Sequence, residues 1–298
     1  MQNMRKYIAS ALMLAAAVTG VQAQDKIKVI ASFSIIADLV KQIGGDHIAV
    51  TSLIGSNGDM HNFQPSPSDS KRIADAQLVV INGLGLEGWA DRLIKASGYR
   101  GARLVAASGI KALPGGGEHG RYDPHAWQEV ANVKVYIANI RAALAEVDPA
   151  HKTDYERATT NYLKQLDALE TEIKAAFDGI PKPQRRIITS HEAFTYYGDA
   201  YNIEFLAPQG ITETSAPSAK NVAQLIRQIK REKIKAVFVE NISNQQLMNR
   251  IASETGAIVG GTLYSDALSE PSGSAATYID MMHHNTRLIA TALRQAKP

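Results

Sequence analysis

Short apolar runs alternate with longer segments of mixed polarity along the chain from residue 26 onward. Each short run is rich in valine and isoleucine and is bounded by polar residues or glycine, which is typical of a buried β-strand. The runs form one group in each half of the chain. The predicted strands are residues 26–32, 47–54, 76–82 and 102–108 in the first half, and 185–190, 202–208, 234–240 and 257–264 in the second.

Helical patterns lie between these strands. They cover residues 35–44, 86–97 and 132–144 in the first half, and 218–232, 244–254 and 276–296 in the second. Strands that alternate with helices predict parallel sheets with helices on both faces. We therefore predict an α/β fold with two lobes, each built on a mostly parallel sheet that is covered by helices.

A long amphipathic helix is predicted between the two halves. Its apolar residues recur at steps of three and four and form one stripe, at Tyr155, Ala158, Tyr162, Leu166, Leu169, Ile173 and Phe177. Pro149 suits the first helical turn, and Gly179 with Pro181 stops the helix. Such a helix, roughly 40 Å long, would be a rigid spine that joins both lobes. A long helix inside one single domain is the alternative.

The predicted domain organisation starts with a signal peptide. Residues 1–23 combine a basic start (Arg5 and Lys6), an apolar run and a small-residue cleavage site, which is the pattern of a secretory signal rather than of a membrane span. We expect residues 24–147 to form the N-terminal lobe, residues 148–180 the linking helix and residues 181–298 the C-terminal lobe. An uncleaved signal anchor is the alternative for the first segment.

Composition narrows the function classes. The chain contains no cysteine, which excludes disulfides, thiolate metal ligands and a lipid anchor on an N-terminal cysteine. Without Arg5 and Lys6, the chain has 30 basic and 29 acidic residues. It therefore has no basic excess that would favour binding to nucleic acid or to a membrane surface. We therefore expect a periplasmic protein that is exported by a cleavable signal peptide and is not lipid-anchored.

Four residues with metal-binding side chains follow predicted strands, two in each half. They are His61, His125, His191 and Asp266. Ligands of open α/β sheets bind outside the carboxyl ends of the strands, so a cleft between the lobes could bring all four together. The alternative for any single loop histidine is that it is simply solvated.

The chemistry of these side chains suits a divalent transition metal. Three imidazoles and one carboxylate match the nitrogen and oxygen donors that tetrahedral Zn²⁺ prefers. Mn²⁺ prefers more oxygen ligands, which a bidentate Asp266 would have to supply. The imidazole content favours zinc, and manganese stays the alternative.

The motifs "GDMHNFQPSPSD", "DPHAW", "TSHEAFTYYGDAYNI", "FVENISN" and "LYSDAL", in this order around a central long helix, resemble the metal-specific solute-binding proteins of zinc and manganese ABC transporters. The resemblance covers nearly all of the chain beyond the signal. It implies two α/β lobes joined by a long helix, with one metal in the cleft, and His61, His125, His191 and Asp266 at the ligand positions. The third position is a glutamate in many manganese members, so His191 supports zinc.

Other polar residues receive secondary roles. Glu240 ends a predicted strand and could orient a ligand histidine through a carboxylate–imidazole contact, or it could cap the sheet end. Glu118 and His119 lie in a short glycine-rich loop, where many zinc members have a long loop rich in histidine and acidic residues. They could form an accessory metal contact, but a simply solvated loop is the favoured alternative. Turn capping explains Asp59 and Asp123 more simply. The remaining histidines are predicted to have no role in the site: His47, His151, His283 and His284.

These observations favour a receptor without catalytic activity. We predict that it captures Zn²⁺, as transported ligand, and delivers it to an inner-membrane ABC permease. We also expect a monomer, with a periplasmic metal chaperone as a further candidate partner, and only small lobe movements because the spine helix is rigid. A manganese or iron receptor, a periplasmic zinc hydrolase, and a binder of organic solutes or surface adhesin on the same scaffold are the alternatives. No H-E-x-x-H or G-x-S-x-G motif supports the hydrolase.

Overall fold

The fold is described by a computed structural model that covers residues 25–115, 121–207, 218–234, 236–242 and 245–295. The predicted signal peptide and the accessory residues Glu118 and His119 lie outside the described residues. Within the part of the chain that the structure describes, every helix is too short or too polar to cross a membrane.

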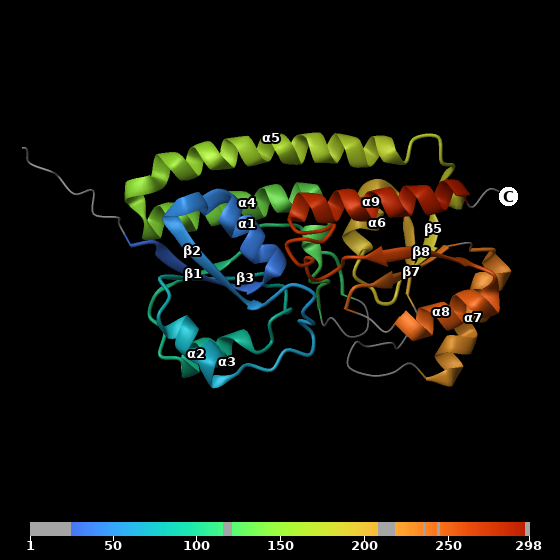
Figure 1. The fold of residues 1–298 in the computed structure, drawn as a ribbon, viewed down its shortest axis with the longest axis horizontal. Helices are drawn as coiled ribbons and strands as arrows, with labels where there is room; N and C mark the ends of the chain where they lie inside the picture. Colours follow the sequence, from blue (N-terminus) through green and yellow to red (C-terminus); the bar gives the residue numbers. More distant parts are fainter. Residues whose placement is uncertain (1–24, 116–120, 208–217, 235, 243–244, 296–298) are drawn as a thin grey trace, which may run out of the picture.

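The first lobe is built on a parallel sheet with the strand order β2-β1-β3-β4. The interior strand β3 is buried at every position, because helices cover both faces of the sheet. In Figure 1, α1 and α4 lie on one face and α2 and α3 on the other. The bounds are β1 Ile27–Phe33, β2 Ile48–Ile54, β3 Leu78–Ile81 and β4 Ala102–Val105, with α1 Ser34–Gly44, α2 Pro67–Ala74, α3 Ala90–Ala96 and α4 Val130–Val147.

The second lobe repeats this arrangement with a parallel sheet of order β6-β5-β7-β8. Helices α6 and α9 lie on one face, and α7 and α8 on the other (Figure 1). The bounds are β5 Arg186–Ile188, β6 Glu204–Leu206, β7 Ala236–Glu240 and β8 Ile258–Leu263, with α6 Thr195–Tyr201, α7 Ala219–Glu232, α8 Gln245–Thr255 and α9 Tyr278–Gln295. The prediction of two helix-covered, parallel-sheet lobes is therefore confirmed.

Helix α5 (Lys152–Ala176) runs along both lobes. Its 25 residues span about 38 Å, and it packs against α1 and α4 of the first lobe along its N-terminal part and against α9 of the second lobe along its C-terminal part (Figure 1). The predicted spine is thus present, but two details were wrong. Pro149 belongs to the short 3-10 helix η3 (Pro149–His151) before α5, and Thr159 is buried where Ala158 was predicted.

One apolar core continues from the first lobe through α5 into the second lobe. It includes Val29 and Leu39 of the first lobe, Leu166 of α5, and Phe238 and Leu293 of the second lobe. A second, smaller core lies between α7, α8 and their sheet. Opening the two lobes widely would expose part of the shared core to water, so the packing favours small movements.

Candidate metal centre

The predicted site residues lie beyond the carboxyl ends of the strands. His61 is on the loop between β2 and α2, and His125 immediately precedes the short 3-10 helix η2 (Ala126–Gln128). His191 follows β5, and Asp266 follows β8. Each lobe therefore contributes two of these side chains, as the strand pattern implies.

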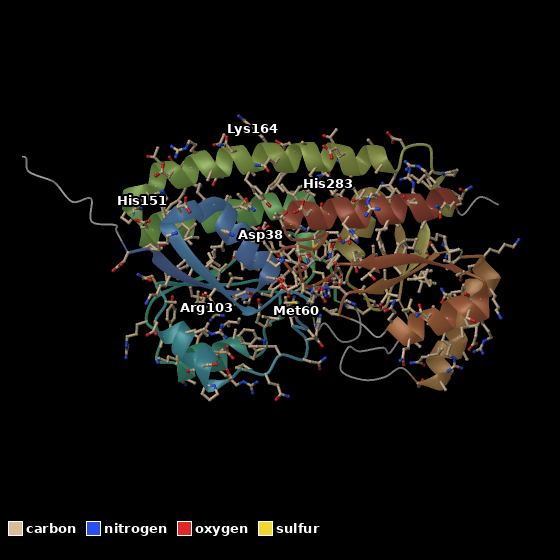
Figure 2. All side chains as sticks on the ribbon, viewed as in Figure 1. Asp38, Met60, Arg103, His151, Lys164 and His283 are labelled. Atoms are coloured by element: carbon tan, nitrogen blue, oxygen red, sulfur yellow. The ribbon has the colours of Figure 1, made fainter. Side chains whose placement is uncertain are left out.

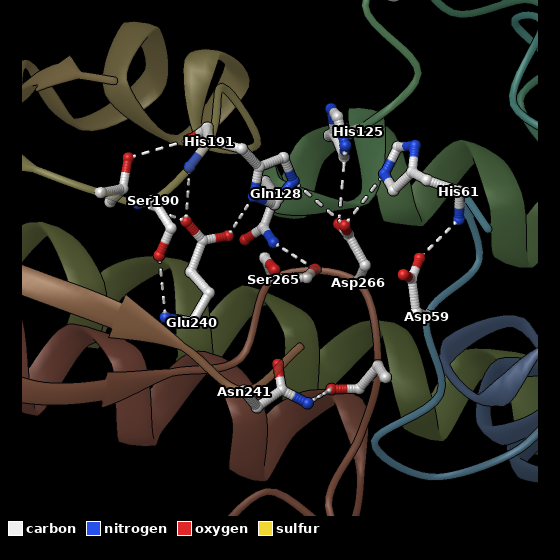
Figure 3. Close-up of polar contacts among 12 residues, drawn as sticks. Asp59, His61, His125, Gln128, Ser190, His191, Glu240, Asn241, Ser265 and Asp266 are labelled. Carbon is white, nitrogen blue, oxygen red and sulfur yellow. Dashed lines mark hydrogen bonds and ion pairs between the residues drawn. The ribbon is translucent and has the colours of Figure 1, made fainter. Parts of the chain in front are cut away.

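The structure brings these four side chains together. One nitrogen or oxygen atom from each residue lies within 4.8 Å of those of the others. The Nε2 atoms of His61 and His191 lie 3.1 Å from Oδ2 of Asp266, and the Nε2 atom of His125 lies 3.5 Å from Oδ1 (Figure 3). Two donors bound to one tetrahedral zinc ion would be about 3.3 to 3.6 Å apart, which is close to these separations.

The cluster is almost closed to solvent. The side chains of His125 and Asp266 are 0% exposed and that of His191 is 4% exposed, whereas that of His61 is 16% exposed. A buried carboxylate needs partners, because an isolated charge in a protein interior is strongly destabilising. Here three imidazoles surround it.

Burial and charge act in opposite directions on the ionisable groups. Burial alone would raise the pKa of Asp266, but the neighbouring His125 and His191 outweigh it and hold that pKa well below its ordinary value. Burial alone would lower the pKa of His191, but the carboxylates of Glu240 and Asp266 outweigh it and raise that pKa well above its ordinary value. Without metal, the site therefore stabilises an imidazolium beside a carboxylate.

Glu240 lies directly behind His191. Its Oε2 atom is 2.6 Å from Nδ1 of His191, and its Oε1 atom accepts the backbone N–H groups of Ser190 (2.8 Å) and His191 (3.0 Å). A carboxylate can only accept hydrogen bonds, so in the metal-free imidazolium Nδ1–H points to Glu240 and Nε2–H donates to Asp266. Loss of the Nε2 proton leaves the lone pair that a metal would bind, while Glu240 keeps the proton on Nδ1. This is the contact proposed from the sequence, and the residue also caps the end of β5 (Figure 3).

Asp123 makes the equivalent contact with His125, a role that the sequence interpretation underestimated. Its Oδ1 atom accepts the backbone N–H of His125 (2.9 Å) and lies 2.8 Å from the ring atom Nδ1. Asp123 therefore both caps the turn and contacts the imidazole ring. The two-residue spacing in "DPH" could have indicated this role, because one aspartate oxygen can reach both the backbone N–H and the ring Nδ1 of the histidine. Asp59, in contrast, caps the turn before His61 as predicted, by accepting its backbone N–H at 2.9 Å.

A buried hydrogen-bond pair connects the segments that carry His125 and Asp266. The indole Nε1–H of Trp127 and the amide Nε2–H of Gln128 both donate to the carbonyl oxygen of Ser265, at 2.9 and 2.7 Å. All three residues are fully buried. Nothing in the local sequence pattern indicates this contact, because it joins residues more than 130 positions apart.

The histidines that were predicted to have no role lie elsewhere. His47 and His151 stack on each other with ring centroids 3.8 Å apart, near the start of α5. His284 lies 2.9 Å from the carbonyl oxygen of Thr262, and His283 is on the exposed side of α9. Figure 2 shows Met60, the neighbour of His61, between the lobes, whereas His151 and His283 are far from that point.

The sequence Ser190-His191-Glu192 does not form a catalytic triad. Glu192 is exposed, and the acid that contacts the His191 ring is Glu240. The Ser190 hydroxyl accepts the backbone N–H of Glu240 at 3.2 Å. Ser190 therefore has a structural role at the end of the sheet.

Two parallel-sheet lobes, a helix that spans both and a convergent set of three histidines and one aspartate define a bilobal receptor for a small cation. A family model described as "zinc-uptake complex component A, periplasmic" matches residues 29–292. The chain belongs to this family of metal-binding receptors of ABC transporters. Family membership also confirms that it is a binding protein and not an enzyme.

Relatives of this chain are named for different metals. The manganese-binding lipoprotein MntA of Halalkalibacterium halodurans is 33% identical over 269 residues, 90% of this chain and 89% of the relative. The iron-binding protein YfeA of Yersinia pestis is 34% identical over 274 residues, 91% of this chain and 87% of the relative. The structure of the periplasmic zinc-binding protein TroA of Treponema pallidum superposes with a TM-score of 0.84 at 26% identity, over 90% of this chain and 99% of that one.

Proposed function

We propose that this receptor captures Zn²⁺ between its lobes and delivers it to an inner-membrane ABC permease. The ligands of the ion would be Nε2 of His61, His125 and His191 together with the carboxylate of Asp266. The observation that carries the proposal is the convergence of these four groups, within 4.8 Å of one another, from four separate segments of the chain. Sites closed by two lobes can both bind and release a ligand.

The donor set supports zinc over manganese. Three imidazoles and one carboxylate suit a four-coordinate Zn²⁺ ion, whereas Mn²⁺ favours a larger number of oxygen ligands. Manganese is the second candidate because MntA is named for that metal. Both oxygens of Asp266 face imidazole nitrogens, so this carboxylate could also bind in a bidentate manner.

The location and the domain boundaries follow from the same interpretation. The family description places its members in the periplasm. Several relatives are named lipoproteins, but this sequence has no cysteine to carry a lipid, so we propose a protein that is released after cleavage of residues 1–23.

We further propose that residues 24–147 and 181–298 form the two lobes and that residues 148–180 form the helix between them. We propose a monomeric receptor, with a periplasmic metal chaperone as a further partner.

A competitive titration with Zn²⁺ and Mn²⁺ tests the proposal. Metal-stripped wild-type protein would be titrated beside His191→Ala, with His283→Ala as the matched control, because His283 is exposed on α9. We expect one zinc ion per chain, weaker manganese binding, and a loss of zinc affinity of at least 100-fold in His191→Ala. His283→Ala should bind like the wild type.

The outcomes separate the two metals from the absence of a metal site. A preference for manganese would keep the receptor function and reverse the choice of metal. Failure of the wild type to bind either ion stoichiometrically would overturn the site, and a binder of organic solutes would then be the leading alternative. Equal losses in both histidine variants would indicate a general structural effect.

A further inference from the structure

The loop that carries His61 encloses the site less firmly than the other three segments. His61 is the most exposed of the four candidate ligands, with 16% of its side chain accessible. His125, His191 and Asp266 are held from behind by buried contacts, which involve Asp123, Glu240 and the Ser265 carbonyl group. Because it is the most exposed of the four, His61 can leave the cluster with a smaller rearrangement than the buried His125, His191 and Asp266.

Asn57 connects this loop to the second lobe. Its backbone N–H donates to the carbonyl oxygen of Leu268 at 2.9 Å, and its side-chain Oδ1 accepts Nδ2–H of Asn241 at 3.1 Å. Asn57 has a positive φ of 52°, which asparagine tolerates better than most residues. The turn thereby directs both its backbone N–H and its side chain toward the other lobe.

The contacts of Asn57 lie next to the segments that hold the other ligands. Leu268 is two residues after Asp266, and Asn241 directly follows Glu240, which orients His191. Asn57 itself is four residues before His61. We call the hydrogen bonds of Asn57 with Asn241 and Leu268 the Asn57 latch. A displacement of the latch would move His61 relative to both ligand segments of the second lobe.

We propose that Asn57 is a positioning residue whose latch holds His61 against the other three ligands and sets the rate at which metal leaves. This inference rests on the proposed metal-binding function. His61 leaves first when the latch opens, because it is the most exposed ligand and the side-chain hydrogen bond of the latch is itself exposed to solvent. The remaining three ligands keep their arrangement.

Removal of the side-chain contact tests the latch. Asn57→Gly retains the positive φ and the backbone N–H but loses Oδ1, and Asn241→Ala removes the donor. Each variant should release Zn²⁺ into excess chelator about two- to fivefold faster in stopped-flow measurements, the effect of one exposed hydrogen bond. The double variant should match the single ones, because both changes remove the same contact. Asn202→Gly is the matched control, since Asn202 also has a positive φ (56°) but lies at the end of α6.

A cross-link across the latch tests whether it must open. The chain has no native cysteine, so Asn57→Cys combined with Asn241→Cys can be joined by a short bifunctional thiol reagent. Release of Zn²⁺ should be at least tenfold slower in the cross-linked protein than in the same variant before cross-linking. The visible spectrum of bound Co²⁺ should be unchanged in all variants, because the ligands are unchanged.

Each result supports or overturns the latch. Wild-type release rates in Asn57→Gly and Asn241→Ala, equal acceleration in Asn202→Gly, or unchanged release after cross-linking would each refute it. A changed Co²⁺ spectrum would show that the variants disturb the ligands themselves, and would also refute it. A wild-type protein without stoichiometric metal binding is a different result, because it overturns the proposed function first.

Discussion

Replacement of Glu240 by glutamine is expected to weaken zinc binding strongly, although the two side chains have nearly the same shape. Glu240 uses one oxygen to accept two backbone N–H groups, and its other oxygen lies 2.6 Å from Nδ1 of His191 as an ion pair. Glutamine has only one oxygen. If that oxygen keeps the backbone contacts, its NH₂ group faces Nδ1, which must then act as an acceptor.

This rearrangement would reverse the tautomer of His191. In that neutral tautomer the proton sits on Nε2 and occupies the lone pair that the metal needs. Loss of such an orienting partner typically lowers metal affinity 10- to 100-fold, about 1.4 to 2.7 kcal/mol. Glu240 and His191 are only 1% and 4% exposed, so water cannot replace the lost acceptor and we expect a value near 100-fold.

Competition with a chromophoric zinc chelator at pH 7.5 measures this difference. Glu192→Gln is the matched control, because Glu192 is adjacent to His191 in sequence but exposed. Nitrogen-15 NMR of the imidazole reports the tautomer directly. An affinity within threefold of the wild type in Glu240→Gln, or an unchanged tautomer, would refute the reasoning.

Three further predictions concern the pH dependence of zinc affinity, the pH dependence of stability in the metal-free protein, and the packing of α5. Zinc affinity should rise with pH through the neutral range, because the raised pKa of His191 keeps a proton that the metal must displace. Calorimetry in buffers of different ionisation enthalpy would show this proton release, and a pH-independent affinity would contradict it. In the metal-free protein, folding stability should change with pH in the opposite direction. The protonated His191 contributes its full stabilisation below the ordinary pKa of histidine, and this contribution is lost as pH rises through the raised pKa. Leu166→Ala should lower the free energy of unfolding by about 2 to 5 kcal/mol, since Leu166 is fully buried on α5. Denaturant titration beside the exposed-site variant Lys164→Ala checks this, and equal stabilities would contradict the spine role of α5.

Local pattern was enough to predict most of the secondary structure. Buried strands such as β3 are continuous apolar runs, and the stripe of α5 has helical spacing, so both are visible without tertiary information. The errors of the secondary-structure prediction occurred at helix boundaries and in short helices. Pro149 satisfied the rule for a first helical turn but lies in η3, and α6, with seven residues and four of them buried, has no amphipathic stripe to reveal it.

The sequence by itself determined which side chains could meet, because the carboxyl ends of parallel strands lie at one edge of a sheet. His61, His125, His191 and Asp266 were identified on that basis. Only the tertiary structure decided that they meet within 4.8 Å, and which carboxylate stands behind each imidazole. Glu240 and His191 are 49 residues apart, and Asn57 and Asn241 are 184 apart. Such contacts depend on how two lobes pack against a shared core, and the period of a single strand or helix carries no information about that packing.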